Sequence, residues 1–293
     1  MRLTIVGCGF VGRALARHYR QRVDSPILHV TVTTTRDKQL VDLGPLADRV
    51  LLCDAGNPDQ LFQALQDADL AVFCLGPKGD RQVDGAGYRR TFIDSFICLQ
   101  GLLPRLTDLQ QIVYTSSCSV YGDANGEWVD ESSPTEPRDE QAAVLLEAEA
   151  LINAMAIPQR RRTCILRLAA LHGPGRDLDH RFDGLAELER SGDGQRHTNW
   201  VHVDDAAGAL HAAIHGGWSG VVNVVDDQPV RLADLLDNAL RRNGLEPIRW
   251  TGGATPSSCD RRVSNRKLKR LGYRLIHPTT ADQSGVLPSS QTP

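Results

Sequence analysis

A glycine pattern near the start of the chain constrains the fold more than any other feature. Residues 7–12 read Gly-Cys-Gly-Phe-Val-Gly, between an apolar segment at residues 3–6 and a helical pattern that runs to about residue 21. In such a G-x-G-x-x-G loop the first glycine allows a tight turn, the second lets the backbone approach a pyrophosphate, and the third lets helix and strand pack closely. The helix N-terminus then offers unpaired N–H groups to the anion. The loop therefore predicts a dinucleotide site, with contacts from Gly7, Gly9, Phe10, Val11 and Gly12.

The next 150 residues repeat the alternation of short β-branched segments and helical patterns. Further strands are predicted at residues 27–34, 50–53, 70–75, 111–116 and 163–171. Helices are predicted at residues 12–21, 37–43, 58–67, 87–103 and 140–155. This alternation favours an α/β fold of the Rossmann type, a doubly wound parallel sheet with helices on both faces.

The character of the sequence changes after residue 171. Gly, Pro, Asp and Arg cluster at residues 173–179 and 191–198, which predicts loops around one short helix. Later elements are expected at residues 221–225 (strand), 232–241 and 266–271 (helices). We therefore expect a Rossmann domain at residues 1–171, to which elements near 200–225 return, an interleaved substrate lobe at 172–283, and a disordered tail at 284–293.

Charge and hydropathy exclude several classes of function. The net charge of -3 lacks the basic excess that favours nucleic acid or anionic membranes as partners. No apolar run approaches the ~20 residues that span a bilayer, and the N-terminus has no room for a signal peptide, so we expect a cytoplasmic protein. The seven cysteines are scattered without a C-x-x-C pair, and Cys118 is expected to be a buried, inert thiol.

The end of the second predicted strand bears on the choice between NAD and NADP. An acidic residue there selects NAD, whereas a nearby Arg accommodates the 2′-phosphate of NADP. Residues 33–36 read Thr-Thr-Thr-Arg, with no carboxylate before Asp37. Arg36 therefore favours NADP over NAD. The alternative is that Arg36 is only a solvated charge at the start of a helix. Asp54, after the third strand, is placed to approach the adenine, and Gly76, after the fourth, to pass the nicotinamide side.

Residues 115–122 read Thr-Ser-Ser-Cys-Ser-Val-Tyr-Gly and resemble a T/S-S-S-x-x-V-Y-G segment. That segment is typical of the extended short-chain dehydrogenase/reductases, the NAD-dependent epimerase/dehydratase family. Residues 166–175 resemble its L-R-x-x-x-x-Y-G-P-G segment with His172 in place of Tyr, and residues 199–205 and 221–224 resemble two further segments, so that the likeness runs to about residue 281. It implies a Rossmann fold, NAD(P), a small-molecule substrate and often a homodimer through the helices at 87–103 and 140–155.

The resemblance also implies roles for individual residues. The family's Ser at the position of Ser117 orients the substrate oxygen, and Ser116 beside it is expected to contact the cofactor. Proton transfer in the family uses a Tyr-x-x-x-Lys pair, which shares one helix face so that the ammonium lowers the pKa of the phenol. Here Gln141 and Leu145 stand at the two positions, and no Tyr-x-x-x-Lys occurs in the chain. In this the chain resembles atypical members of the family.

Two classes of function remain open. In the first, the protein is a redox or epimerase/dehydratase-type enzyme for a small or nucleotide-linked carbonyl or hydroxyl substrate. Ser117 would hold the carbonyl, and His172, at the mouth of the lobe, would act as general acid with an unperturbed pKa near 6.5, with Tyr121 as a weaker alternative. In the second, the protein is a non-catalytic NAD(P)-binding sensor or regulatory module. Arg176 and His180 in the loop at residues 173–181 fit substrate contacts of an enzyme, but solvated arginines are common in loops.

A metal site is not expected. His197 and His202 with Asp204 and Asp205 run along a predicted strand into a helix start, where Asp204 or Asp205 is expected to be the N-cap. Ser117 lacks the G-x-S-x-G surroundings of a hydrolase nucleophile.

Overall fold

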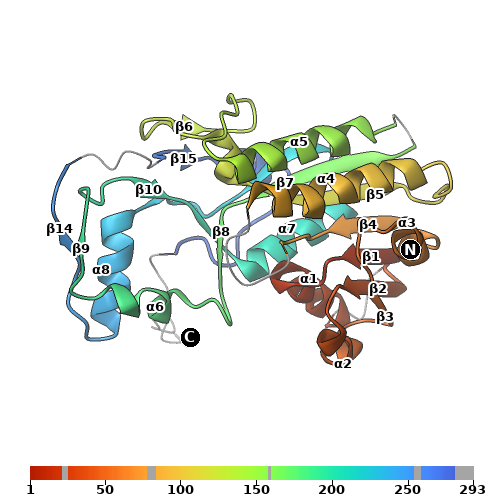
Figure 1. Cartoon of the computed structure of the whole chain (residues 1–293), viewed down its shortest axis with the longest axis horizontal. Helices are drawn as coiled ribbons and strands as arrows, with labels where there is room; N and C mark the ends of the chain where they lie inside the picture. Colours follow the sequence, from red (N-terminus) through yellow and green to blue (C-terminus); the bar gives the residue numbers. More distant parts are fainter. Residues whose placement is uncertain (22–25, 78–83, 158–159, 254–258, 281–293) are drawn as a thin grey trace, which may run out of the picture.

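A seven-stranded parallel sheet forms the centre of the computed structural model, which describes residues 1–21, 26–77, 84–157, 160–253 and 259–280 (Figure 1). The strand order is β12-β7-β5-β4-β1-β2-β3. The strands are β1 (Arg2–Val6), β2 (His29–Thr34), β3 (Arg49–Leu52), β4 (Leu70–Phe73), β5 (Gln111–Ser117), β7 (Arg162–Leu168) and β12 (Gly220–Val224). The order reverses between β1 and β4, and ligands of open α/β sheets bind at such a reversal, outside the carboxyl ends of the strands. The predicted Rossmann-type α/β fold is confirmed.

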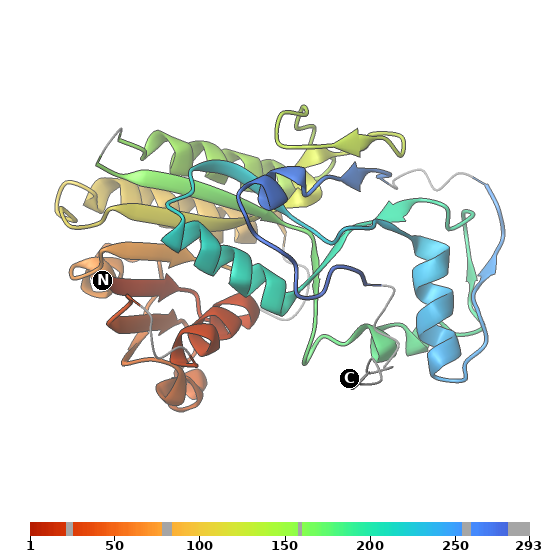
Figure 2. The same ribbon diagram turned by 180° about the vertical axis from the view of Figure 1, so that it is seen from behind.

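Helices cover both faces of this sheet (Figures 1 and 2). One face carries α1 (Phe10–Arg20) and α7 (Val203–His215), and the other carries α3 (Pro58–Leu65), α4 (Gly85–Leu102) and α5 (Glu140–Ala154). Leu3 and Ile5 of β1 belong to the core under α1, whereas Val6 belongs to the core under α4. Because successive strand residues point to opposite faces, two apolar cores require strands that are buried on both sides, as is usual in parallel sheets.

Polar side chains cap the N-termini of the helices that follow the central strands. They thereby fix where the loops at the carboxyl edge of the sheet end. Oδ1 of Asn57 accepts two backbone N–H groups at 3.1 Å at the start of α3. Asp84 and Asp139 do the same for α4 and α5, accepting N–H groups at 2.8 and 2.7 Å. Asn and Asp are among the best N-cap residues because they satisfy helix donors that otherwise lack a partner.

Two predicted elements differ in the structure. The strand expected at residues 163–171 is interrupted: β7 ends at Leu168, and β8 (Ala170–His172) leaves the sheet to pair in parallel with β11 (Trp200–His202). The helix expected at residues 37–43 is a 3₁₀ turn (Asp37–Gln39) followed by the short helix α2 (Leu40–Leu43).

Short elements beyond β8 form a lobe beside the sheet (Figure 1). They are α6 (Leu178–Arg181), β9 (Glu189–Arg190), β10 (His197–Thr198), β13 (Val230–Arg231), α8 (Leu232–Arg242) and β14 (Arg249–Trp250). Small apolar clusters of the lobe's own hold them together, one of which contains Leu178, Trp200 and Leu235.

The chain then returns toward the sheet through β15 (Arg262–Val263), which pairs with β6 (Trp128–Val129), and α9 (Arg266–Arg270). The predicted tail at residues 284–293 lies outside the described residues. Within the described ranges, no helix has both the length and the apolar character that crossing a bilayer requires.

Candidate functional site

A cleft of about 1690 Å³ follows the carboxyl ends of the central strands and extends to the lobe. Pockets for small ligands usually measure about 300–1,000 Å³, so this cleft has room for a dinucleotide and a second ligand. Of the cofactor residues expected from the sequence, all except Gly12 line it. These are Gly7, Gly9, Phe10, Val11, Arg36, Asp54, Gly76 and Ser116.

The surroundings of the three glycines in the loop at residues 7–12 explain why each position needs glycine. Gly7 has a φ of +86°, and a Cβ there would lie 2.8 Å from the carbonyl oxygen of Cys74. A Cβ on Gly12 would lie 2.8 Å from the carbonyl oxygen of Gly7, whereas a Cβ on Gly9 would meet nothing within 4 Å. Gly7 and Gly12 are therefore required by the fold, and Gly9 keeps the cleft open. No side chain caps α1 at Gly9, which leaves the first N–H groups of the helix to an anion.

Two arginines near the glycine loop and the end of β2 in the sequence line the cleft. Arg36 follows the strand, and its N–H donates to Oγ1 of Thr34 at 3.1 Å. Arg13, in the first turn of α1, also lines the cleft. Sequence reasoning missed Arg13, although its place directly after the last glycine of the loop was a usable signal. Asp54 also lines the cleft, and its N–H donates to Oε1 of Gln60 at 2.8 Å.

Ser117 ends β5 at the wall of the cleft, where its Oγ accepts the N–H of Ser119 at 3.1 Å. The neighbouring Ser116 is buried and donates its hydroxyl to Oε1 of Glu149 at 2.6 Å. Leu145 presents an apolar surface to the cleft, and Gln141 is not among the lining residues. The part of α5 that faces this site therefore supplies no ammonium group.

His172 is buried, with 1% of its surface exposed. Its ring lies 5.1 Å from that of His202 and 6.3 Å from that of Trp200, measured between centroids. Burial lowers the pKa of His172 to about 4, so the expectation of an unperturbed pKa near 6.5 is wrong. The physical reason is the pairing of β8 with β11, which takes the imidazole out of water and disfavours its charged form. At neutral pH His172 holds no proton to donate as an imidazolium.

Tyr121 and Cys118 are buried residues with structural hydrogen bonds. The hydroxyl of Tyr121 donates to Oδ1 of Asn223 at 2.7 Å, and burial raises the pKa of this buried phenol. Sγ of Cys118 donates to the carbonyl oxygen of Arg167 at 3.3 Å, and burial raises the pKa of the thiol to about 12. Neither residue lines the cleft.

Tyr88 of α4 lines the cleft and was missed by sequence reasoning. Within the described ranges it is the one tyrosine that does so. Burial, together with the nearby Asp139, raises its pKa, which keeps the phenol protonated at neutral pH. Helical periodicity gave no signal for this residue, because its exposure to the cleft depends on how α4 lies on the sheet.

The lobe contributes Arg176 and Arg181 to the cleft. The guanidinium of Arg176 lies 4.5 Å from the centre of the Phe10 ring, and this contact connects the lobe to the glycine loop. His180, expected with Arg176 as a substrate contact, does not line the cleft; its exposed Nδ1 lies 3.0 Å from Oδ2 of Asp183.

The two histidines expected along one strand lie in two, His197 in β10 and His202 at the end of β11. His197 turns to Asp260, with Nδ1 2.9 Å from Oδ1. The N-cap of α7 is His202, whose Nδ1 accepts the N–H of Asp204 at 3.2 Å. The expectation that Asp204 or Asp205 caps this helix is wrong, because the helix begins one residue after His202 and both carboxylates lie inside its first turn.

A model of the NAD dependent epimerase/dehydratase family matches residues 3–224. This chain belongs to that family. The resemblance seen in residues 115–122 is thereby confirmed, and membership of the NAD dependent epimerase/dehydratase family places the chain among enzymes that use a nicotinamide dinucleotide.

Similar proteins cover almost the whole chain. Protein YeeZ of Escherichia coli K12 is 28% identical, over 94% of this chain and 96% of that protein. DesIV, a dTDP-glucose 4,6-dehydratase from Streptomyces venezuelae solved with NAD bound, is 22% identical with a TM-score of 0.78, over 94% of this chain and 92% of that one. MoeE5 in complex with UDP-glucuronic acid and NAD is 21% identical with a TM-score of 0.77, over 94% of each chain. At these identities the two structures support the fold alone.

Proposed function

We propose that this protein is an oxidoreductase or epimerase/dehydratase-like enzyme that uses NADP in preference to NAD. Its substrate is a small or nucleotide-linked carbonyl or hydroxyl compound. The observation that carries the proposal is a single cleft that contains both the glycine loop after β1 and Ser117 at the end of β5. In this proposal residues 1–171 bind the dinucleotide, and the lobe within residues 172–283 holds the substrate.

The residues of the cleft fit NADP. The open space at Gly9 admits the pyrophosphate, and the uncapped start of α1 offers N–H donors to it. Arg13 and Arg36 supply positive charge at the end of the cleft where the ribose of the adenosine half would lie, which suits a 2′-phosphate. When bound, the dinucleotide supplies the hydride chemistry, and the protein supplies binding and orientation.

The proton donor is assigned to Tyr88 in place of His172. The hydroxyl of Ser117 would hold the substrate oxygen, and the protonated phenol of Tyr88 would donate to the same oxygen as negative charge develops on it. Leu145 stands on α5 where the family has its lysine, so this helix supplies no ammonium to lower the pKa of a phenol, and Tyr88 works as an acid rather than as a base.

The arginines of the lobe favour a charged substrate. Arg176 and Arg181 of the lobe line the cleft, and guanidinium groups bind phosphate and carboxylate through paired hydrogen bonds. MoeE5, which shares the fold, was solved with UDP-glucuronic acid, so nucleotide-linked sugars belong among the substrates to be tested.

Turnover tests the proposal. Purified protein is assayed with NADPH and NADH against aldehydes, ketones and sugar nucleotides, alongside Ser117→Ala, Tyr88→Phe and the control Ser132→Ala, whose hydroxyl bonds to Asp130 on the surface. We expect turnover to fall about 10²-fold or more in the two cleft variants, with unchanged dinucleotide affinity. Dinucleotide binding without turnover on any substrate would instead favour a non-catalytic NAD(P)-binding sensor. This is the second candidate because the chain lacks the Tyr-x-x-x-Lys pair.

A homodimer and a cytoplasmic location complete the proposal. The helices α4 and α5, through which the family resemblance implies dimerisation, lie side by side on one face of the sheet (Figure 1). All seven cysteines are free thiols, as is usual in a reducing compartment. Light scattering that gives twice the chain mass of 32.1 kDa would support the dimer, and the single mass would oppose it.

A further inference from the structure

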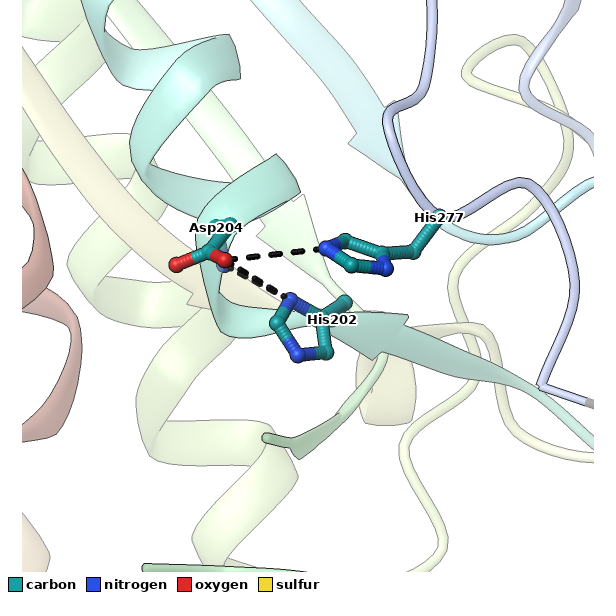
Figure 3. Close-up of side chains that lie close together, drawn as sticks. All are labelled: His202, Asp204 and His277. Atoms are coloured by element: carbon teal, nitrogen blue, oxygen red, sulfur yellow. Dashed lines mark hydrogen bonds and ion pairs between the residues drawn. The ribbon is translucent and has the colours of Figure 1, made fainter. Parts of the chain in front are cut away.

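Three potential metal ligands meet at the start of α7, outside the cleft (Figure 3). His202 ends β11, Asp204 lies in the first turn of α7, and His277 lies on the segment after α9. Oδ2 of Asp204 lies 3.5 Å from Nδ1 of His202 and 3.6 Å from Nε2 of His277. The three ligand atoms all lie within 4.8 Å of one another, and no other group of three such residues is found in the part of the chain that the structure describes.

We propose that His202, Asp204 and His277 bind a zinc ion. Zinc bonds of about 2.0–2.2 Å in a tetrahedron separate the ligand atoms by roughly 3.3–3.6 Å, which matches the two distances to the carboxylate. Two imidazole nitrogens and one carboxylate oxygen select zinc over magnesium and calcium, which prefer all-oxygen sites. Asp204 is 54% exposed, so a water molecule can reach the fourth position.

His202 presents a lone pair to this site. A backbone N–H can only donate, and that of Asp204 donates to Nδ1 of His202 at 3.2 Å, so the proton of the neutral ring is on Nε2. An ion would take over this lone pair from a long hydrogen bond. A cation at a helix N-terminus is opposed by the helix dipole, but Asp204 and Asp205 in the first turn supply compensating negative charge.

Asp205 holds His277 in place independently of any ion. Its Oδ1 accepts the hydroxyl of Tyr273 at 2.9 Å and the N–H of Ile276 at 2.6 Å, and its Oδ2 accepts the N–H of His277 at 2.8 Å. The backbone next to the third ligand is therefore fixed by a buried carboxylate, as is usual for supported metal sites. A bound ion would connect the segment after α9 to α7 and would stabilise the folded state by mass action.

The test uses untagged, full-length protein that has been stripped with a chelator. Calorimetric titration with zinc is expected to show one ion per chain at micromolar affinity or tighter, and cobalt is expected to give the visible absorption of a tetrahedral site. Binding is also expected to raise the melting temperature and to slow hydrogen exchange at Ile276 and His277. A wild-type protein that binds neither ion at micromolar concentrations overturns the proposal.

Variants locate the site. We expect His277→Ala and Asp204→Asn to lower zinc affinity at least tenfold. His202→Asn is expected to do the same while keeping an oxygen that can cap α7, so that loss of the ligand is separated from loss of the helix cap. The matched control is His180→Ala, which removes the imidazole of another His–Asp pair at the surface. Equal affinity in wild type and His277→Ala, or an equal loss in His180→Ala, would show that zinc binds elsewhere. This site does not depend on the proposed enzymatic function.

Discussion

Arg167 and Glu149 form a buried ion pair directly behind Ser116. Nη2 of Arg167 lies 2.7 Å from Oε2 of Glu149, and both side chains are less than 10% exposed. The other carboxylate oxygen accepts the hydroxyl of Ser116. The pair thus connects β7, β5 and α5 at the wall of the cleft, where the cofactor and the substrate are proposed to meet.

Removing the carboxylate of this pair should strongly destabilise the fold. Glu149→Ala leaves the guanidinium of Arg167 buried without compensation, which costs about 3–5 kcal/mol. Urea unfolding measures this loss. Glu147→Ala, also on α5, removes an exposed ion-pair partner of Arg89 on α4 and should leave the free energy of unfolding nearly unchanged. A similar loss in both variants would contradict a special role for the buried pair.

The two glycines Gly7 and Gly9 should respond differently to the same substitution. Gly9→Ala adds a methyl group that meets nothing within 4 Å, so the variant should fold with a nearly unchanged melting temperature and lose dinucleotide affinity at least tenfold. Gly7→Ala should unfold at a clearly lower temperature, because of its φ of +86° and the contact with Cys74. Normal dinucleotide affinity in Gly9→Ala would contradict the position assigned to the pyrophosphate.

The buried Asp226 should make stability depend on pH. It accepts the hydroxyl of Thr280, and burial raises its pKa from 3.8 to about 7. The folded state therefore binds more protons than the unfolded state between these values, so the stabilisation is complete below about pH 4 and is lost as the pH rises through 7.

The control for Asp226 is a side chain that cannot ionise. Asp226→Asn should lose less stability than wild type between pH 5 and 8, with slopes that differ by up to about 1.4 kcal/mol per pH unit. His172, whose pKa is shifted in the opposite sense, is present in both proteins and cancels in the comparison. Parallel stability curves from urea unfolding would show that Asp226 ionises in the folded state as it does in water.

Sequence patterns predicted the features that depend on residues close together in the chain. The glycine spacing of residues 7–12 and the alternation of apolar segments are local, and they gave the dinucleotide loop and the central sheet. His172 could not be placed, because its burial depends on the pairing of β8 with β11, which are distant in sequence. His277 gave no signal either, since it reaches Asp204 only through the bonds of its segment to Asp205.

A titration of the purified protein with NADPH and NADH by fluorescence tests the central claim most directly. We expect both dinucleotides to bind and NADPH to bind more tightly. Arg36→Ala should weaken NADPH about tenfold, a loss of about 1.4 kcal/mol, and leave NADH unchanged, whereas Arg138→Ala, at an exposed ion pair with Asp123, should change neither affinity. Failure of the wild-type protein to bind either dinucleotide would contradict the account.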